Sequence, residues 1–154
     1  MINYELNFIS NSELDTISIG QKISKISQQG DVFALSGTLG MGKSVFARSF
    51  VQELCGQIDV PSPTFTLVQL YDAPDFIIYH FDLYRLKSPE EIFELGIEEA
   101  MYEGVCLIEW PEKMGAYLPN KAIKIEISPI EQGRNIKLIF NNEQDYQRFL
   151  TIKD

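Results

Sequence analysis

The chain has 154 residues, of which 45% are hydrophobic and 23% charged, and this ordinary globular composition argues against a largely disordered protein. Its formal net charge of −9 excludes nucleic-acid binding by bulk electrostatics, because neutralising phosphates requires clustered Lys and Arg. No apolar run approaches the roughly 18 residues of a membrane span, and residues 1–10 lack the features of a secretory signal. We therefore expect one cytoplasmic domain over residues 1–154, with no membrane partner.

The first half of the chain alternates between strands and helices. Residues 3–9 are typical of a short strand, and a helix is expected from the N-cap Ser12 until Gly30 stops it. Residues 31–36 have the apolar pattern of a buried strand, and a glycine-rich segment follows at once. A second helix comes next and is expected to end at Gly56.

The second half is richer in strands. Ser88 is expected to begin a helix, because Pro89 and two acids follow it, and residues 142–152 are expected to form a closing helix. The expected strands cover residues 64–71, 76–81, 104–108, 122–128 and 135–140. Together these elements predict an α/β domain with a mixed, partly parallel sheet flanked by helices.

The glycine-rich segment is the strongest chemical signal. Residues 37–44 read GTLGMGKS, which matches G-x-x-x-x-G-K-[ST] at every fixed position, between a strand and a helix. Backbone N–H groups of such a loop cradle phosphates, Lys43 adds a point charge, and Ser44 offers a hydroxyl to Mg²⁺. We therefore expect a P-loop NTPase-type three-layer domain that binds ATP and Mg²⁺. The alternative is a glycine-rich turn that merely caps a helix. The expected nucleotide-binding residues of this segment are Gly37, Thr38, Leu39, Gly40, Met41, Gly42, Lys43 and Ser44.

Two carboxylates follow apolar strands and are candidates for the same site. Glu109 ends a strand like a Walker B acid, and Asp82 comes directly after residues 76–81. Since ligands gather at the carboxyl ends of strands in open α/β sheets, we assign Glu109 to Mg²⁺ and Asp82 to the attacking water. A solvated acid at a strand end is the alternative for each.

Four further residues are left open by the sequence. Thr64 lies in a Ser-Pro-Thr segment that is either a γ-phosphate switch or a simple proline turn. For His80, a packed and hydrogen-bonded ring is favoured over a catalytic one. Trp110 either contacts a base or partner, or packs in the core. Arg85 either reaches a phosphate or forms a structural ion pair.

Other classes of site are disfavoured. Cys55 and Cys106 form no CxxC motif or Cys/His cluster, so neither zinc nor a disulfide framework is expected. The guanine-specific N-K-x-D element is absent, because residues 120–123 read NKAI, which argues against a GTPase. Only four arginines are present, too few and too scattered for the phosphate-clamping lid of a small-molecule kinase.

Four motifs of the chain resemble the TsaE family, the bacterial ATPase of tRNA threonylcarbamoyladenosine biosynthesis. They are GTLGMGKS at 37–44, SPTFTLV at 62–68, HFDLYRL at 80–86 and LIEWPE at 107–112, in the family's order and spacing. The resemblance implies an ATPase that assists N6-threonylcarbamoyl modification of adenosine 37 in tRNA. It also implies that the partners are TsaD and TsaB, so that tRNA is contacted only indirectly.

The resemblance also implies roles for particular residues. The family usually has Thr where this chain has Ser44, and often Ala where it has Met41. Two alternatives to an ATPase stay open: a nucleotide-gated binding module without essential hydrolysis, and a small-molecule kinase. The implied catalytic residues are Lys43, Thr64 and Asp82, the metal positions are Ser44 and Glu109, and Thr16 matches an early nucleotide contact.

Overall fold

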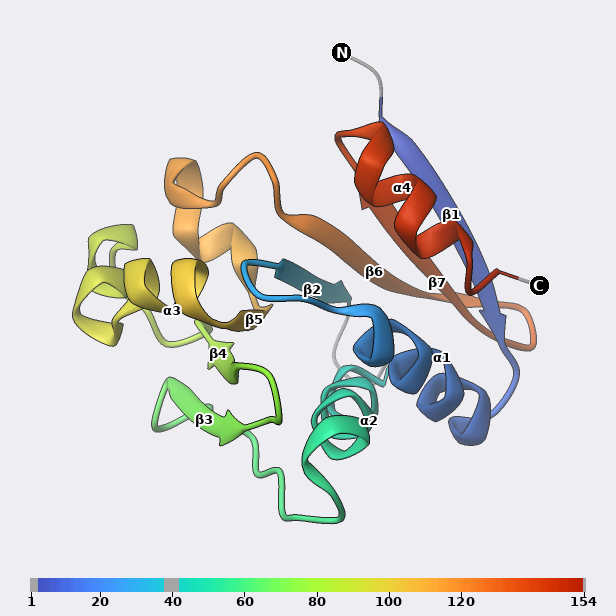
Figure 1. The fold of residues 1–154 in the computed structure, drawn as a ribbon, viewed down its shortest axis with the longest axis horizontal. Helices are drawn as coiled ribbons and strands as arrows, with labels where there is room; N and C mark the ends of the chain where they lie inside the picture. The colour runs from blue at the N-terminus through green and yellow to red at the C-terminus, as the bar shows by residue number, and fades with distance from the viewer. Residues whose placement is uncertain (1–2, 38–41, 154) are drawn as a thin grey trace.

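The structure is a computed structural model, which describes residues 3–37 and 42–153 (Figure 1). Its strands are β1 (Tyr4–Ser10), β2 (Val32–Gly37), β3 (Val68–Asp72), β4 (Ile77–Asp82), β5 (Val105–Glu109), β6 (Ile123–Ile130) and β7 (Gly133–Phe140). Its helices are α1 (Glu13–Ile26), α2 (Lys43–Cys55), α3 (Ile97–Glu103) and α4 (Glu143–Leu150), with the 3-10 helices η1 (Pro89–Leu95) and η2 (Pro111–Tyr117).

The strands form one seven-stranded mixed sheet in the order β1-β7-β6-β2-β5-β4-β3. The four strands β6, β2, β5 and β4 are parallel, whereas β1, β7 and β3 join as antiparallel strands. The mixed, partly parallel α/β sheet predicted from the sequence is therefore confirmed. Because parallel strands end at the same edge, the carboxyl ends of β2, β5 and β4 lie together.

Helices cover both faces of this sheet and give three layers (Figure 1). One core joins α1, α2 and α4 to the sheet and includes Phe33, Phe46 and Phe149. The other core joins η1, α3 and η2 to the opposite face and includes Ile92 and Met114. Central strand residues alternate between the two cores, as the period of a strand covered on both faces requires.

Most element boundaries lie within two residues of those expected, and three elements differ by more. Helix α1 has the expected Ser12 N-cap but ends at Ile26, four residues before Gly30. The strand expected from residue 64 begins only at Val68, because residues 64–66 form a turn and the N–H of Leu67 donates to the carbonyl of Pro63 (2.6 Å).

The third difference is the helix expected to start at Ser88. It begins as the 3-10 helix η1, and Gly96 ends it in the left-handed region (φ 77°), so α3 continues in a new direction. A glycine accepts this conformation at little cost, so the helix that Ser88 caps is a short 3-10 helix and α3 is a separate element.

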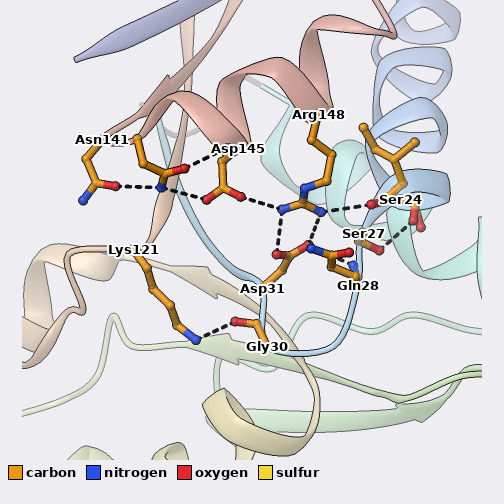
Figure 2. A network of polar contacts seen from close by, with 11 residues as sticks. Ser24, Ser27, Gln28, Gly30, Asp31, Lys121, Asn141, Asp145 and Arg148 are labelled. Atoms are coloured by element: carbon orange, nitrogen blue, oxygen red, sulfur yellow. Dashed lines mark hydrogen bonds and ion pairs between the residues drawn. The ribbon is translucent and has the colours of Figure 1, made fainter. Parts of the chain in front are cut away.

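Helix α4 is tied to the start of β2 by a polar network (Figure 2). The Arg148 guanidinium donates to both carboxylate oxygens of Asp31 (2.8 and 2.9 Å), to Asp145 (3.1 Å) and to the carbonyl of Ile26 (3.0 Å). Burial lowers the pKa of Arg148, but the hydrogen bonds and charges of Asp31 and Asp145 outweigh it and raise the pKa above its usual value. Lys121 adds a hydrogen bond to the carbonyl of Gly30 (2.7 Å). The network therefore joins α1, β2, α4 and the segment before β6.

The two cysteines are free thiols. Cys106 is buried in β5, and burial raises its pKa to about 12, so it stays protonated and unreactive at neutral pH. Across the described ranges 3–37 and 42–153, no helix has both the length and the apolar character needed to cross a membrane.

We predict that Arg148→Met destabilises the fold by about 3 kcal/mol, because it leaves the carboxylate of Asp31 with little solvent and without its partner. The free energy of unfolding from urea titrations measures this effect. The control is Arg48→Met, whose ion pair with Glu13 (3.7 Å) is exposed and should cost less than about 1 kcal/mol. Equal losses in the two variants would contradict the structural role of the network.

Candidate functional site

The glycine-rich segment joins the end of β2 to the start of α2, as the sequence predicted. Gly42 is the N-cap of α2 and lies in the left-handed region (φ 96°), which a residue with a Cβ rarely adopts. No side chain caps α2 and no acidic residue lies in its first turn, so its N-terminal N–H groups and dipole favour an anion. The expected binding residues 38–41, namely Thr38, Leu39, Gly40 and Met41, lie outside the described residues.

A cavity of about 510 Å³ opens at the start of α2. It brings together seven residues singled out from the sequence, from four separate motifs. Its lining residues are Gly42, Lys43, Ser44, Val45, Ser62, Thr64, Asp82, Tyr84, Glu109 and Trp110. A cavity of this size, with the charged side chains of Lys43, Asp82 and Glu109 in its wall, can hold a small ligand. Tyr84 was not predicted from the sequence as a site residue, although it belongs to the same motif as Asp82 and follows it by two residues.

The two carboxylates lie opposite each other at the ends of neighbouring strands. Asp82 of β4 is in register with Glu109 of β5, and Glu109 is in register with Leu35 of β2. Asp82 is 5% exposed and Glu109 is 7% exposed. Both acids are therefore held at the cavity wall by backbone pairing, and neither is a freely solvated acid at a strand end.

Asp82 is the centre of a hydrogen-bond chain. Its Oδ2 accepts from the hydroxyl of Thr64 (3.0 Å), its Oδ1 accepts from the N–H of Tyr84 (3.1 Å), and the hydroxyls of Ser62 and Thr64 are 2.7 Å apart. The N–H of Asp82 also donates to the carbonyl of Leu67 (3.0 Å), so both its side chain and its backbone hold the turn that carries Thr64. The turn and Asp82 are therefore joined by two direct hydrogen bonds.

Glu109 is bonded to the single histidine of the chain. The Nε2 of His80 lies 2.7 Å from Oε2 of Glu109, and His80 is 2% exposed. The packed, hydrogen-bonded ring favoured from the sequence is confirmed.

Lys43 and Trp110 are in contact across the cavity. The Nζ of Lys43 lies 4.5 Å from the centre of the indole ring, within the range of a cation–π interaction, and Tyr84 packs against the same ring at 4.8 Å. Trp110 is therefore at the site and also packed against the core. Arg85 does not line this cavity; its guanidinium lies 4.9 Å from the ring of Phe65, which is exposed.

Thr16 lies on the other side of the start of α2. Its hydroxyl is 2.7 Å from that of Ser10, and its methyl group faces Gly42. It lines a second cavity of about 390 Å³, which shares Gly42 and Val45 with the first. The residues of this cavity that the sequence did not single out include Asn11, Glu13, Gly133 and Arg134, which come from distant parts of the chain.

These residues fit a magnesium-bound polyphosphate. No group of three or more His, Cys, Asp or Glu that could hold a metal occurs among the described residues. Mg²⁺ does not require such a cage, since it typically takes one or two protein oxygens and completes its shell with waters and phosphates. Ser44, Asp82 and Glu109 supply hard oxygens at one cavity, beside the Lys43 ammonium. The individual roles assigned from the sequence stay predictions.

Comparisons with known proteins agree on one family. The family model "Threonylcarbamoyl adenosine biosynthesis protein TsaE" matches residues 10–136. Curated relatives named tRNA threonylcarbamoyladenosine biosynthesis protein TsaE include one from Rickettsia conorii, 39% identical over 88% of this chain and 78% of the relative. Another, from Bacillus subtilis, is 35% identical over 73% of this chain and 71% of the relative. The crystal structure of Bacillus subtilis YdiB covers 99% of this chain and 95% of its own, with a TM-score of 0.79 and 25% identity.

We predict that ATP with Mg²⁺ changes the fluorescence of Trp110, the only tryptophan, because phosphates draw the Lys43 ammonium away from its ring. A titration of the intrinsic emission measures this change. Lys43→Met should abolish the response. A full response in that variant would show that displacement of the Lys43 ammonium is not what changes the emission of Trp110.

Proposed function

The chain belongs to the TsaE family of threonylcarbamoyl adenosine biosynthesis proteins, and on that premise we propose that it is an Mg²⁺-dependent ATPase of this pathway. Its hydrolysis would assist formation of N6-threonylcarbamoyladenosine at position 37 of tRNA, through binding to TsaD and TsaB. The observation that carries the proposal is the convergence of Lys43, Asp82 and Glu109 at one cavity beside the start of α2. These residues come from three motifs that are separate in the chain, and together they supply the cation and the carboxylates that phosphate and Mg²⁺ bind.

The residues at the start of α2 would bind the phosphates. The N–H groups at the start of α2 and the ammonium of Lys43 are donors that converge on one side of a polyanion. Ser44 and Glu109 are the residues that would hold Mg²⁺. When bound, the metal neutralises charge on the phosphate oxygens during transfer.

Asp82 is the residue that would orient the attacking water. Its two oxygens already accept from Thr64 and Tyr84, so its direction is set before any ligand arrives. Thr64, on the turn bonded to Asp82, is the candidate γ-phosphate sensor. A sensor bonded to the water-orienting acid couples recognition of the third phosphate to hydrolysis.

The second cavity suits the nucleoside end of the same ligand. It adjoins the first through Gly42 and Val45, and Thr16 borders it. A ligand with its phosphates at Lys43 would therefore extend past Gly42 toward Thr16. This position agrees with the nucleotide contact expected at Thr16.

The acidic charge of the chain supports action through proteins rather than on RNA. A net charge of −9 repels the tRNA backbone, so an effect on tRNA modification must pass through the proteins that hold the tRNA. This reasoning supports TsaD and TsaB as the partners.

We predict that Lys43→Ala loses ATP turnover and weakens ATP binding by on the order of 1.5–3 kcal/mol, because a charge-assisted phosphate contact is removed. Steady-state phosphate release and calorimetry measure the two effects. Lys124→Ala, an exposed lysine on β6, is the matched control and should behave as the parent. Turnover at the parental rate in Lys43→Ala would refute the assignment.

We predict that Asp82→Asn retains ATP binding but hydrolyses ATP at least about a hundredfold more slowly, because the amide cannot accept the proton of water. Single-turnover hydrolysis and co-precipitation with purified TsaD and TsaB, with and without ATP, separate hydrolysis from docking. If this variant supported repeated tRNA modification cycles as well as the parent, the protein would be a nucleotide-gated binding module instead.

A further inference from the structure

His80 is a polar side chain at a buried position in the core of the protein. It lies in β4 between Tyr79 and Phe81, both buried, and is itself 2% exposed. Its Nδ1 is buried and has no hydrogen-bond partner among the described residues. An aliphatic side chain would fill this place without burying an unpaired nitrogen, so packing alone does not account for a histidine here.

The single hydrogen bond of the ring points at the site. Nε2 lies 2.7 Å from Oε2 of Glu109, and an ionised carboxylate can only accept, so this contact with an ionised Glu109 requires the hydrogen on Nε2. His80 and Asp82 are two residues apart on β4 and share a face of the sheet, and Asp82 is in register with Glu109. The imidazole therefore reaches Glu109 from the core side, beneath the cavity.

This bond engages one of the two carboxylate oxygens. A small space of about 20 Å³ lies beside the pair and is lined by Ser44, Ser62, His80 and Glu109, among others. The two groups proposed to hold Mg²⁺, Ser44 and Glu109, thus border the same space as the ring that fixes one of them. Holding Oε2 toward the core leaves Oε1 as the oxygen that can face a metal.

We infer that His80 is a positioning residue, which orients the Glu109 carboxylate for Mg²⁺ through its Nε2–H. The inference rests on the proposed function, because it concerns the metal of the same site. Partners that fix a ligating carboxylate typically change metal affinity by ten- to a hundredfold when they are lost. His80 touches neither phosphate nor water in this role.

Two substitutions separate the hydrogen bond from the packing. The side-chain amide of His80→Gln places an N–H near the position of Nε2, whereas that of His80→Asn reaches only the position of Nδ1. The measured quantity is the gain in affinity for ATPγS on replacing EDTA with Mg²⁺, determined by calorimetry. We expect His80→Asn to reduce this gain at least tenfold and His80→Gln to keep it within about threefold, with the affinity in EDTA unchanged in both.

The results of this experiment distinguish failure of the proposed ATPase function from failure of the role inferred for His80. If the parent protein does not bind ATPγS under either condition, the proposed function fails and the inference with it. If the parent shows the gain and His80→Asn shows the same gain, the inference alone fails. It also fails if the Asn and Gln variants lose the gain equally, because the N–H donor is then not the cause.

A measurement on the parent protein tests the bond even where a variant does not fold. His80 is the only histidine, so ¹⁵N NMR of the imidazole reports on this ring alone. We expect a proton on Nε2, and a shift of that signal when Mg²⁺ is added with ATPγS. An unprotonated Nε2 would overturn the inference, because such a ring cannot donate to Glu109.

Discussion

The parallel pairing of β2, β5 and β4 is the constraint on which the site depends. It brings the end of β2, where the glycine-rich segment begins, next to Glu109, and Glu109 next to Asp82. Backbone hydrogen bonds, rather than contacts between the charged groups, therefore hold two carboxylates close together at one cavity wall. Burial of both faces of these strands secures the pairing, since a shift of register would expose the apolar residues of two cores.

The parts of the fold predicted from the sequence are those with a strong local pattern. Asp82 and Glu109 were predicted because each follows or ends an apolar strand. Lys43 was predicted because it belongs to a phosphate-loop motif between a strand and a helix, and all three were expected at one site. The predicted boundaries of helices and strands were wrong where the backbone conformation, rather than the pattern of side chains, ends an element. The left-handed Gly96 ends the helix that starts after Ser88 as a short 3-10 helix, and a turn closed by Pro63 shortens the strand expected from residue 64.

The contacts inside the site were beyond sequence reasoning because they join residues far apart in the chain. The bond between His80 and Glu109, 29 residues apart, depends on the register of two strands, which spacing alone does not give. The contact between Lys43 and Trp110 likewise depends on the left-handed backbone of Trp110 (φ 58°), which turns the chain after β5. The second cavity combines residues around Ser10, Gly42 and Gly133, which are far apart in the chain, so it is seen only in the folded structure.

The two hydrogen bonds from Arg148 to Asp31 connect the last helix, α4, to the start of the central strand β2. Asp31 immediately precedes β2, and the other end of that strand leads into the phosphate loop. Strand β2 is thus held just before its first residue by a side chain more than a hundred positions downstream, and its other end leads into the proposed nucleotide-binding segment. Helix α4 lines neither of the two cavities at the start of α2, yet it holds the residue directly before β2.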